Sequence, residues 1–306
     1  MIQSFTAMSD RVKESGRQRI VVAAAQDNDV LLAVDRAARL GIAEPVLVGH
    51  RDMILEAADH CGVDPSRYEI INEEDNSEAC KTAVRLIREH KADAIMKGLV
   101  GTALLLKAIL NKETGIRDRE LLSHIGLFFI AKTERFAIVT DAAMSIAPDI
   151  FMKRHIIENA VEAAHLLGIE IPKVACVCAL EKVNPAMQAT VDAAQLVGMN
   201  LAGEILGCLV GGPLALDNAL FAKAAQHKGI TDPVAGNPDI LLMPNIEAGN
   251  VLYKALAFLC DSPGAGLVLG AKAPVILTSR SDNDDTKLNS IILALYLASM
   301  KKDETA

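Results

Sequence analysis

Short apolar runs alternate with amphipathic stretches along most of the chain. The apolar runs are typical of β-strands and cover residues 20–25, 45–48, 94–97, 126–131, 136–140, 174–180, 205–210, 240–243, 266–269 and 274–278. Helical spacing of apolar side chains predicts helices over 29–40, 103–110, 156–167 and 186–197. Strands buried on both faces read as continuous apolar runs, and their alternation with helices indicates parallel βαβ units. The pattern therefore predicts an α/β fold with open sheets.

Chain length and the lack of a linker shape the expected domain organisation. The chain has 306 residues, and at about 150 residues per domain this predicts two domains. No stretch rich in Pro, Gly and Ser separates two halves, so we expect the boundary in TDAAMSIAPD (140–149). A last helix over 286–300 is expected to return to the first domain. We predict a discontinuous α/β domain over 1–143 plus 276–306 and a second α/β domain over 144–275.

Composition and charge exclude several classes of protein. Apolar residues make up 51% of the chain and charged residues 23%, which excludes a disordered protein. A net charge of −8 and only 3% aromatic residues argue against nucleic-acid binding. The N-terminus has no apolar signal-peptide core, and no apolar run approaches the roughly 20 residues of a membrane span. We therefore expect a cytoplasmic protein that binds neither nucleic acid nor a membrane.

The spacing of cysteines and glycines predicts neither a metal site nor a dinucleotide-binding motif. Cys176 and Cys178 form a C-x-C in a strand-like run that places both on one face, and no further ligand cluster follows at zinc-site spacing. We expect reduced thiols that are buried as small apolar groups, and no metal. The G-x-G at 264–266 leads into a strand and lacks the third glycine of the dinucleotide fingerprint, which disfavours NAD.

Residues that follow a strand are candidates for a site, because ligands in open α/β sheets bind beyond the carboxyl ends of the strands. In AIMKGLVGTALLLKAIL (94–110), Lys97 and Gly98 end a strand and Thr102 is expected to cap the next helix. Backbone N–H groups, the helix dipole and the ammonium predict an anion site. The lysine precedes the glycines, so this is not a P-loop. An ordinary βα turn with a solvated lysine is the alternative.

Two other loops place polar residues after a strand. ILLMPNIEAGNVLYKAL (240–256) carries Asn245, Glu247 and Asn250, a set suited to orienting a polar ligand. GPLALDNALF (212–221) places Asp217 and Asn218 where they line a cleft or face solvent. In both loops solvated side chains are the alternative interpretation.

The most specific stretch is PVILTSRSDNDDTKLNSIILAL (274–295). Its strand delivers Ser279 and Arg280 to the crevice, and an arginine fork at a strand end suits phosphate or a developing oxyanion. Asp282 and Asp285 precede a helix with one apolar face, where aspartates also serve simply to cap and complement the helix N-terminus.

Seven segments, in order from about Ile20 to Met300, resemble the phosphate acetyltransferase/butyryltransferase family, most closely its butyryltransferase branch. They are AIMKGLVGTALLLKAILNKETG, LLSHIGLF, VTDAAMSIAPDI, LEKVNPAMQATVDAAQL, GPLALDNA, PNIEAGNVLYKAL and APVILTSRSDNDDTKLNSI. The resemblance implies reversible transfer of a short-chain acyl group between CoA and inorganic phosphate, with CoA as substrate and no permanently bound cofactor. It also implies two α/β domains of the isocitrate/isopropylmalate dehydrogenase-like type, a cleft between them that holds the active site, and a homodimer.

Carried over by motif, Ser279 and Arg280 match the catalytic Ser–Arg pair of the family. By this resemblance the serine holds the CoA sulfur, and the arginine steadies the phosphate and the transition-state charge. The acetyltransferases have an Asp seven residues after the serine, where this chain has Thr286, so Asp282 and Asp285 are the alternatives for the base. A carboxylate at a helix N-terminus is a poor base unless shielded. Alternatively, Arg280 favours the thiolate and the aspartate orients the substrate.

Other functions stay open at this point. Phosphate acetyltransferase activity is one, because acyl groups that differ by one or two methylenes are not told apart by sequence. An NAD- and metal-dependent decarboxylating dehydrogenase of the same fold is another, although its acidic metal cluster is missing. A non-catalytic CoA-binding regulator is a third, against which the intact Ser279–Arg280 pair argues.

Overall fold

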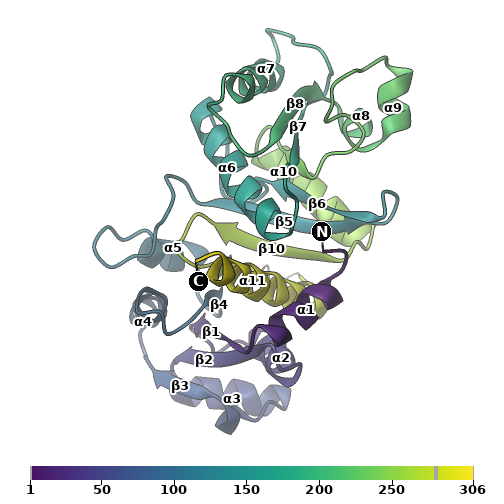
Figure 1. Cartoon of the computed structure of the whole chain (residues 1–306). Coiled ribbons are helices and arrows are strands. Elements are labelled where there is room, and N and C mark those ends of the chain that lie inside the picture. The colour runs from purple at the N-terminus through teal and green to yellow at the C-terminus, as the bar shows by residue number, and fades with distance from the viewer. Residues whose placement is uncertain (1, 279–281, 306) are drawn as a thin grey trace. The chain divides into compact units, whose positions relative to one another are not determined.

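A computed structural model of the chain describes residues 2–278 and 282–305 and has a mixed α/β fold (Figure 1). The chain divides into two compact units. Unit 1 comprises Met1–Gln3 and Leu121–Gly264, and unit 2 comprises Ser4–Glu120 and Ala265–Ala306. Both units are therefore discontinuous in sequence. The domain boundaries expected from the sequence, 143/144 and 275/276, differ from the limits of these two units. The division of the chain into domains at those boundaries stays a prediction.

The strands of unit 2 lie in the order β3–β2–β1–β4–β11–β10. β1 pairs in parallel with β2 and with β4, so Ile20 lies opposite both Pro45 and Ala94. β2 also pairs in parallel with β3, and β11 with β4, whereas β10 and β11 are antiparallel. The bounds are β1 (Gln18–Ala23), β2 (Ala43–Gly49), β3 (Glu69–Asn72), β4 (Ala94–Lys97), β10 (Gly264–Leu269) and β11 (Val275–Ile276).

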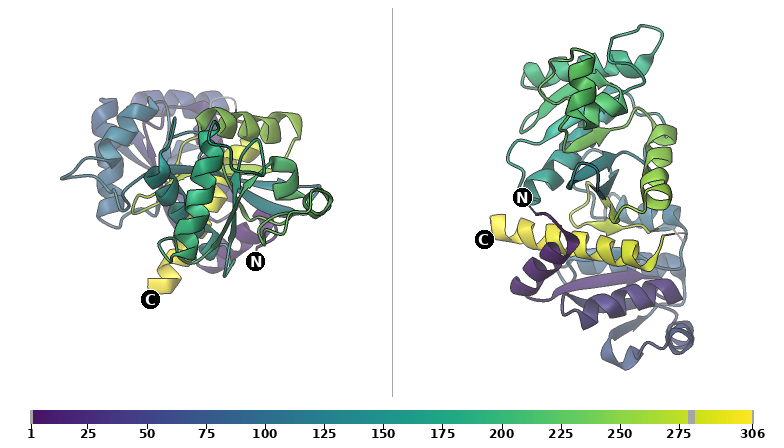
Figure 2. Two further views of the ribbon diagram at one scale, coloured as in Figure 1. Left: turned by 90° about the horizontal axis from the view of Figure 1, so that it is seen from above. Right: turned by 90° about the vertical axis from the view of Figure 1, so that its right-hand side faces the viewer.

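Several helices of unit 2 begin at side chains that cap them, among them α2 and α4. Asp27 accepts a hydrogen bond from the backbone N–H of Val30 at 3.2 Å, and Asp75 accepts one from Ser77 at 2.7 Å. The last helix, α11, packs against α1 and α2, and Figure 2 shows α11 in yellow beside α1 in purple. The helices are α1 (Phe5–Glu14), α2 (Asn28–Arg39), α3 (Arg51–Cys61), α4 (Asn76–Arg88), α5 (Thr102–Ile109) and α11 (Asp284–Thr305), with a short 3-10 helix over Pro65–Arg67.

The strands of unit 1 lie in the order β5–β6–β9–β7–β8. β5 and β6 are antiparallel, and the β6–β9, β9–β7 and β7–β8 pairs are parallel. The strands are β5 (Ser123–Ile130), β6 (Arg135–Thr140), β7 (Lys173–Val177), β8 (Leu209–Leu214) and β9 (Ile240–Leu242). The helices are α6 (Ile150–Leu166), α7 (Gln188–Leu201), α8 (Leu216–Leu220), α9 (Ala222–His227) and α10 (Ile246–Lys254), and a π-helix follows over Ala255–Leu259.

An aromatic pair lies in the core of unit 1. Phe128 on β5 and Tyr253 on α10 meet edge to face, with ring centroids 4.9 Å apart and planes at 77°. Val139, Ala175 and Leu241, from three neighbouring strands, pack in the same cluster. The contact holds α10 on the sheet and so determines where the loop before α10 lies.

Several expected elements differ in the structure. The strand expected over 205–210 is β8, Leu209–Leu214, because positive φ angles at Gly203 and Gly207 put a turn there. The short strand β3 was not expected from the sequence pattern. Two strand pairs are antiparallel because their connections are only a few residues long, whereas a parallel crossover needs about a dozen.

Two expectations about cysteines were wrong. β7 ends at Val177, so Cys178 lies past the strand and does not share a strand face with Cys176. Cys260, at the end of the π-helix, is exposed, whereas Cys80, Cys176, Cys178 and Cys208 are buried and Cys61 is half-buried. Burial raises the pKa of Cys178 to about 11, so this thiol stays protonated at neutral pH.

A substitution of Gly98 tests the close contact between the ends of β4 and β1. A Cβ atom at Gly98 would lie 2.1 Å from the carbonyl oxygen of Ala24. We expect Gly98→Ala to lower the free energy of unfolding by about 1–3 kcal/mol, measured by denaturant titration, because backbone cannot move aside cheaply.

The matched control is Gly198→Ala in α7, where no atom lies within 4 Å of the added Cβ. It should leave stability unchanged or raise it by up to about 1 kcal/mol, because Ala favours a helix over Gly. Equal effects of the two substitutions would contradict the close contact at Gly98.

Candidate functional site

The strand order of each unit indicates where a ligand would bind. In unit 2 the chain passes from β1 outward to β2 and β3, and then returns to β4 on the other side of β1. In unit 1 it passes from β7 to β8 and returns to β9 on the other side of β7. Ligands of open α/β sheets bind at such reversals, beyond the carboxyl ends of the strands. The two candidate regions are the ends of β1 and β4 in unit 2, and of β7 and β9 in unit 1.

At the end of β4 the chain lies directly on the end of β1. The backbone N–H of Gly98 donates to the carbonyl of Ala23 at 2.9 Å, and that of Leu99 donates to Ala24 at 2.7 Å. Lys97 is half-buried, and its Nζ donates to the carbonyl oxygens of Gly98 at 3.1 Å and Val100 at 3.3 Å. The ammonium is therefore held close to the loop before α5, as an anion site would require.

Thr102 does not cap α5, which corrects the expectation from the sequence. The N-cap is Gly101, without a side-chain hydrogen bond, and Thr102 is the first residue of the helix. Within the described part of the chain, the N-cap residue of α5 therefore offers no side-chain acceptor to the first N–H groups. Such a terminus favours an anion through its N–H groups and the helix dipole.

Ser279 and Arg280 lie outside the described residues, and the structure resumes at Asp282. The residue that caps α11 is Asn283, whose Oδ1 accepts from the backbone N–H of Thr286 at 2.7 Å. The interpretation that an aspartate caps this helix is therefore wrong. Lys287, one turn into the helix, donates from Nζ to the carbonyl oxygen of Asp282 at 2.8 Å.

The two aspartates proposed as bases have different surroundings. Asp282 is 9% exposed, whereas the side chain of Asp285 is 74% exposed. Asp285 forms an ion pair with Arg36 of α2, with 2.7 Å between Nη1 and Oδ1. The two carboxylates therefore differ in exposure and in partner, and Asp285 is engaged by Arg36 at the surface.

In unit 1, Asn245 and Asn250 have structural partners. Asn245 caps α10, because its Oδ1 accepts from the backbone N–H of Ala248 at 3.0 Å. Asn250 is exposed and donates from Nδ2 to the carbonyl of Ala142 at 3.3 Å. Glu247, in the first turn, is exposed. The structure brings these residues together around the start of α10, at the carboxyl end of β9.

Asp141, at the end of β6, is a buried carboxylate that the sequence analysis missed. It is 2% exposed, and its Oδ1 accepts from the backbone N–H groups of Ala143 and Met144, each at 2.9 Å. Its Oδ2 has no hydrogen-bond partner among the described residues. A Cβ at Gly249 of α10 would lie 2.5 Å from the Asp141 carbonyl oxygen. An Asp at the start of a loop is a signal for such a turn, which the sequence could have supplied.

Asp217 and Asn218 do not form a site together. The Asp217 side chain is 58% exposed and lies 3.8 Å from Nζ of Lys228. Asn218 is fully buried, and its side-chain oxygen and nitrogen have no hydrogen-bond partner among the described residues. The interpretation as solvated side chains holds for Asp217 and is wrong for Asn218.

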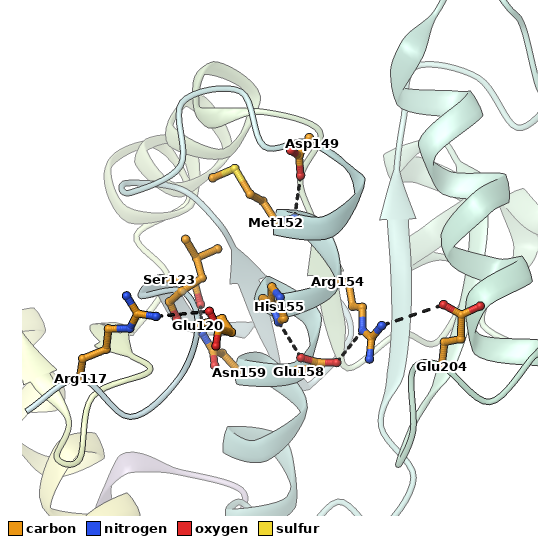
Figure 3. A network of polar contacts seen from close by, with 11 residues as sticks. Arg117, Glu120, Ser123, Asp149, Met152, Arg154, His155, Glu158, Asn159 and Glu204 are labelled. Carbon is orange, nitrogen blue, oxygen red and sulfur yellow. Dashed lines mark hydrogen bonds and ion pairs between the residues drawn. The ribbon is translucent and has the colours of Figure 1, made fainter. Parts of the chain in front are cut away.

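A polar network on α6 is a surface feature of unit 1 (Figure 3). Glu158 lies 2.9 Å from Nδ1 of His155, and it accepts a hydrogen bond from Nε of Arg154 at 2.9 Å. Arg154 also reaches Glu204 at 4.0 Å. Partial burial opposes the charge of Glu158, but the hydrogen bonds from Arg154 and His155 outweigh it and lower the pKa of Glu158. The network ties α6 to the loop before β8 and lies outside the predicted site.

A cavity of about 470 Å³ in unit 1 is lined by none of the predicted site residues. Three segments line it, namely residues 181–182, 212–214 and 228–232. Lys228 and Glu181 form an ion pair at its edge, with 3.3 Å between Nζ and Oε2.

Each predicted residue in the described ranges lies near the carboxyl end of a strand or in the first turns of a helix within its own unit. Unit 2 holds Lys97, Gly98, Thr102, Asp282 and Asp285, and unit 1 holds Asn245, Glu247 and Asn250. Across the described ranges, 2–278 and 282–305, no group of three or more His, Cys, Asp or Glu side chains is arranged to hold a metal ion. Within the same ranges, every helix is too short or too polar to span a membrane.

Comparisons with known proteins match nearly the whole chain to relatives of one family. Residues 5–82 and 73–295 match the sequence profile of the family described as phosphate acetyl/butaryl transferase. Phosphate butyryltransferase of Clostridium acetobutylicum is 48% identical over 301 residues, which is 98% of this chain and 100% of that protein. Phosphate acetyltransferase of Thermotoga maritima is 41% identical over 281 residues, 92% of this chain and 95% of that protein.

A solved structure agrees with the sequence relatives. The crystal structure of a branched-chain phosphotransacylase from Enterococcus faecalis V583 superimposes with a TM-score of 0.82 at 29% sequence identity. The match covers 92% of this chain and 99% of that chain.

Substitution of Asn245 tests its role as the N-cap of α10. We expect Asn245→Ala to lower the free energy of unfolding by about 0.5–2 kcal/mol, because the N–H of Ala248 loses its acceptor. Asn245→Asp should keep the wild-type stability, because Asp caps a helix equally well. Denaturant titration of the three proteins checks this, and equal destabilisation by Ala and Asp would contradict it.

Proposed function

The chain belongs to the phosphate acetyl/butyryl transferase family, and from this premise we propose that it interconverts butyryl-CoA and inorganic phosphate with butyryl phosphate and CoA. The observation that carries the proposal is the 48% identity with phosphate butyryltransferase of Clostridium acetobutylicum over 98% of the chain. The 41% identity with the acetyltransferase of Thermotoga maritima makes acetyl transfer the second candidate. CoA is then a substrate and not a resident cofactor.

The reaction needs an anion site and a proton acceptor. A phosphate oxygen attacks the thioester carbonyl carbon, the C–O bond forms, the C–S bond breaks, and the CoA sulfur leaves as thiolate and takes up a proton. In reverse, the CoA thiol, with an ordinary pKa of about 8.5, loses its proton before the sulfur attacks butyryl phosphate. Negative charge grows on the carbonyl oxygen in both directions, so fixed positive groups and N–H donors accelerate the step.

We assign the anion site to the end of β4 and the start of α5. Lys97 supplies the ammonium, and the N-terminus of α5, whose N-cap is Gly101, supplies N–H donors. Gly98 permits the close backbone contact that keeps this loop in place. Arg280 and Ser279 complete the proposed set through the family motif, the arginine at the phosphate and the serine at the CoA sulfur.

We assign proton transfer to Asp282. Asp282 is buried and lies two residues after Arg280 of the family motif, whereas Asp285 is exposed and paired with Arg36. Thr286, at the position of the acetyltransferase Asp, uses its backbone N–H for the helix cap. We place Asn245, Glu247 and Asn250 as candidates for contacts with the acyl-CoA.

Three finer features belong to the same proposal. We propose that the two α/β units follow the isocitrate/isopropylmalate dehydrogenase-like arrangement, in line with the strand reversal in each unit. The homodimer and the cytoplasmic location implied by the family resemblance stay predictions. Sedimentation and cell fractionation test them.

Acyl-chain preference tests the proposed substrate. We expect kcat/KM for phosphate-dependent release of CoA thiol to be highest for four-carbon acyl-CoA. One methylene in an apolar pocket is worth about 1–3 kcal/mol, and acetyl-CoA is two methylenes shorter than butyryl-CoA, so it should be at least about 30-fold poorer. The assay compares acetyl-, propionyl-, butyryl- and isobutyryl-CoA.

A preference for acetyl-CoA would replace the butyryl assignment with the second candidate. Binding of CoA without phosphate-dependent release from any of the four would overturn the enzymatic proposal.

Paired substitutions test the proton acceptor. We expect Asp282→Asn to lower kcat by about 10²–10⁴, the usual contribution of a general base. Asp285→Asn is the matched control and should stay within about twofold of wild type, because an exposed ion pair contributes little. Steady-state kinetics with butyryl-CoA and phosphate measures both, and a larger loss at Asp285 would reverse the assignment.

A further inference from the structure

Lys287 is a buried cation in an unfavourable place. It lies in the first turn of α11 and is only 3% exposed. Lysine is rarely buried unless it is fully paired, and a positive charge near a helix N-terminus opposes the helix dipole. Where a sequence departs from such rules, the position is often functional.

A second buried lysine shows what full compensation looks like. Lys153 of α6 lies 2.6 Å from Asp192, and the two side chains are 5% and 9% exposed. The other Asp192 oxygen accepts from the exposed Gln188 at 2.7 Å, so the buried ammonium faces a buried carboxylate that has a second hydrogen bond. The carboxylate partner of Lys287 is Asp29 of α2, at 3.0 Å, and its side chain is 54% exposed. The ion pair of Lys287 is therefore half in water and compensates burial of the ammonium less well.

Among the described residues, Lys287 also contacts the backbone of Asp282. Nζ donates to the Asp282 carbonyl oxygen at 2.8 Å. The next residue, Asn283, is held by two further bonds: its Oδ1 accepts from the N–H of Thr286, and its carbonyl accepts from the N–H of Lys287 at 3.1 Å. The peptide units on both sides of Asn283 are thus fixed to the first turn of α11. Lys287 supplies the bond that reaches Asp282.

We propose that Lys287 is a positioning residue for Asp282. Its ammonium fixes the backbone of Asp282 against α2 and α11, and the carboxyl group is thereby held in place for proton exchange with the CoA sulfur. Lys287 itself touches no substrate. The inference rests on the proposed function, in which Asp282 accepts the proton.

The test compares Lys287→Met and Lys287→Arg with Lys302→Met. Lys302 is on the same helix and forms an ion pair with Asp93, with 2.7 Å between Nζ and Oδ1. Asp93 directly precedes β4 and is not one of the proposed site residues. Measurements are kcat, KM for butyryl-CoA and phosphate, the pH dependence of kcat, and the melting temperature.

We expect Lys287→Met to lower kcat at least tenfold and to displace the acidic limb of the kcat–pH profile, while KM for butyryl-CoA stays within about twofold. Its melting temperature should stay close to wild type, because the partner left behind, Asp29, is half-exposed and its charge is solvated once the lysine is removed. Lys287→Arg should recover part of kcat. Lys302→Met should keep the wild-type kcat and pH profile.

A further variant, Asp29→Asn, separates the ion pair from the backbone contact. It removes the carboxylate charge but leaves the Lys287 bond to Asp282, so kcat should fall by less than about threefold. Equal losses in Asp29→Asn and Lys287→Met would overturn the proposal. A wild-type kcat and pH profile in Lys287→Met would also overturn it. If the wild-type protein releases no CoA thiol from any acyl-CoA, the proposed function fails before Lys287 is tested.

Discussion

Two backbone hydrogen bonds past the end of the β1–β4 ladder determine the shape of the candidate site in unit 2. They join the N–H groups of Gly98 and Leu99 to the carbonyls of Ala23 and Ala24. They bring the turn after β4 so close to β1 that a side chain at Gly98 would overlap the Ala24 carbonyl. Because α5 starts only four residues later, this contact also determines where its N-terminus lies. The proposed anion site therefore depends on the absence of one Cβ atom.

Lys153 and Lys287, both buried, have different surroundings. In unit 1, Lys153 and Asp192 are both buried and satisfy each other, and they join α6 to α7. In unit 2, Lys287 lies opposite a half-exposed carboxylate and uses another bond on a backbone carbonyl. The first arrangement satisfies charges within a folded core. The second is poorly compensated and lies beside Asp282, which fits a role in positioning that residue.

Local sequence rules predicted most of the elements and failed where a residue had two possible partners. The buried run IVVA of β1 and the Asp27-capped α2 lie close to their expected positions. Thr102 has a side chain suited to capping, but it is the first residue of α5 and Gly101 is the N-cap. The start of α5 depends on the contacts that the preceding loop makes with the end of β1. Among Asp282, Asn283, Asp284 and Asp285, every side chain has capping chemistry, and the fold uses Asn283. The burial of Asp141 could not be predicted from the sequence, which offered only an Asp at the start of a loop, because its partners are the backbone N–H groups of Ala143 and Met144.

The sequence by itself determined the α/β class, most strand positions and the family, because apolar periodicity and motif order are properties of the chain. It also identified the strand ends as the places for chemistry, because parallel strands end at a common edge. Only the tertiary structure decided that Asp282 is buried while Asp285 pairs with Arg36 in water. It also decided that Lys287 reaches Asp282 and Asp29. Burial and pairing depend on residues distant in sequence, such as Asp29 and Lys287, and no local pattern carries that information.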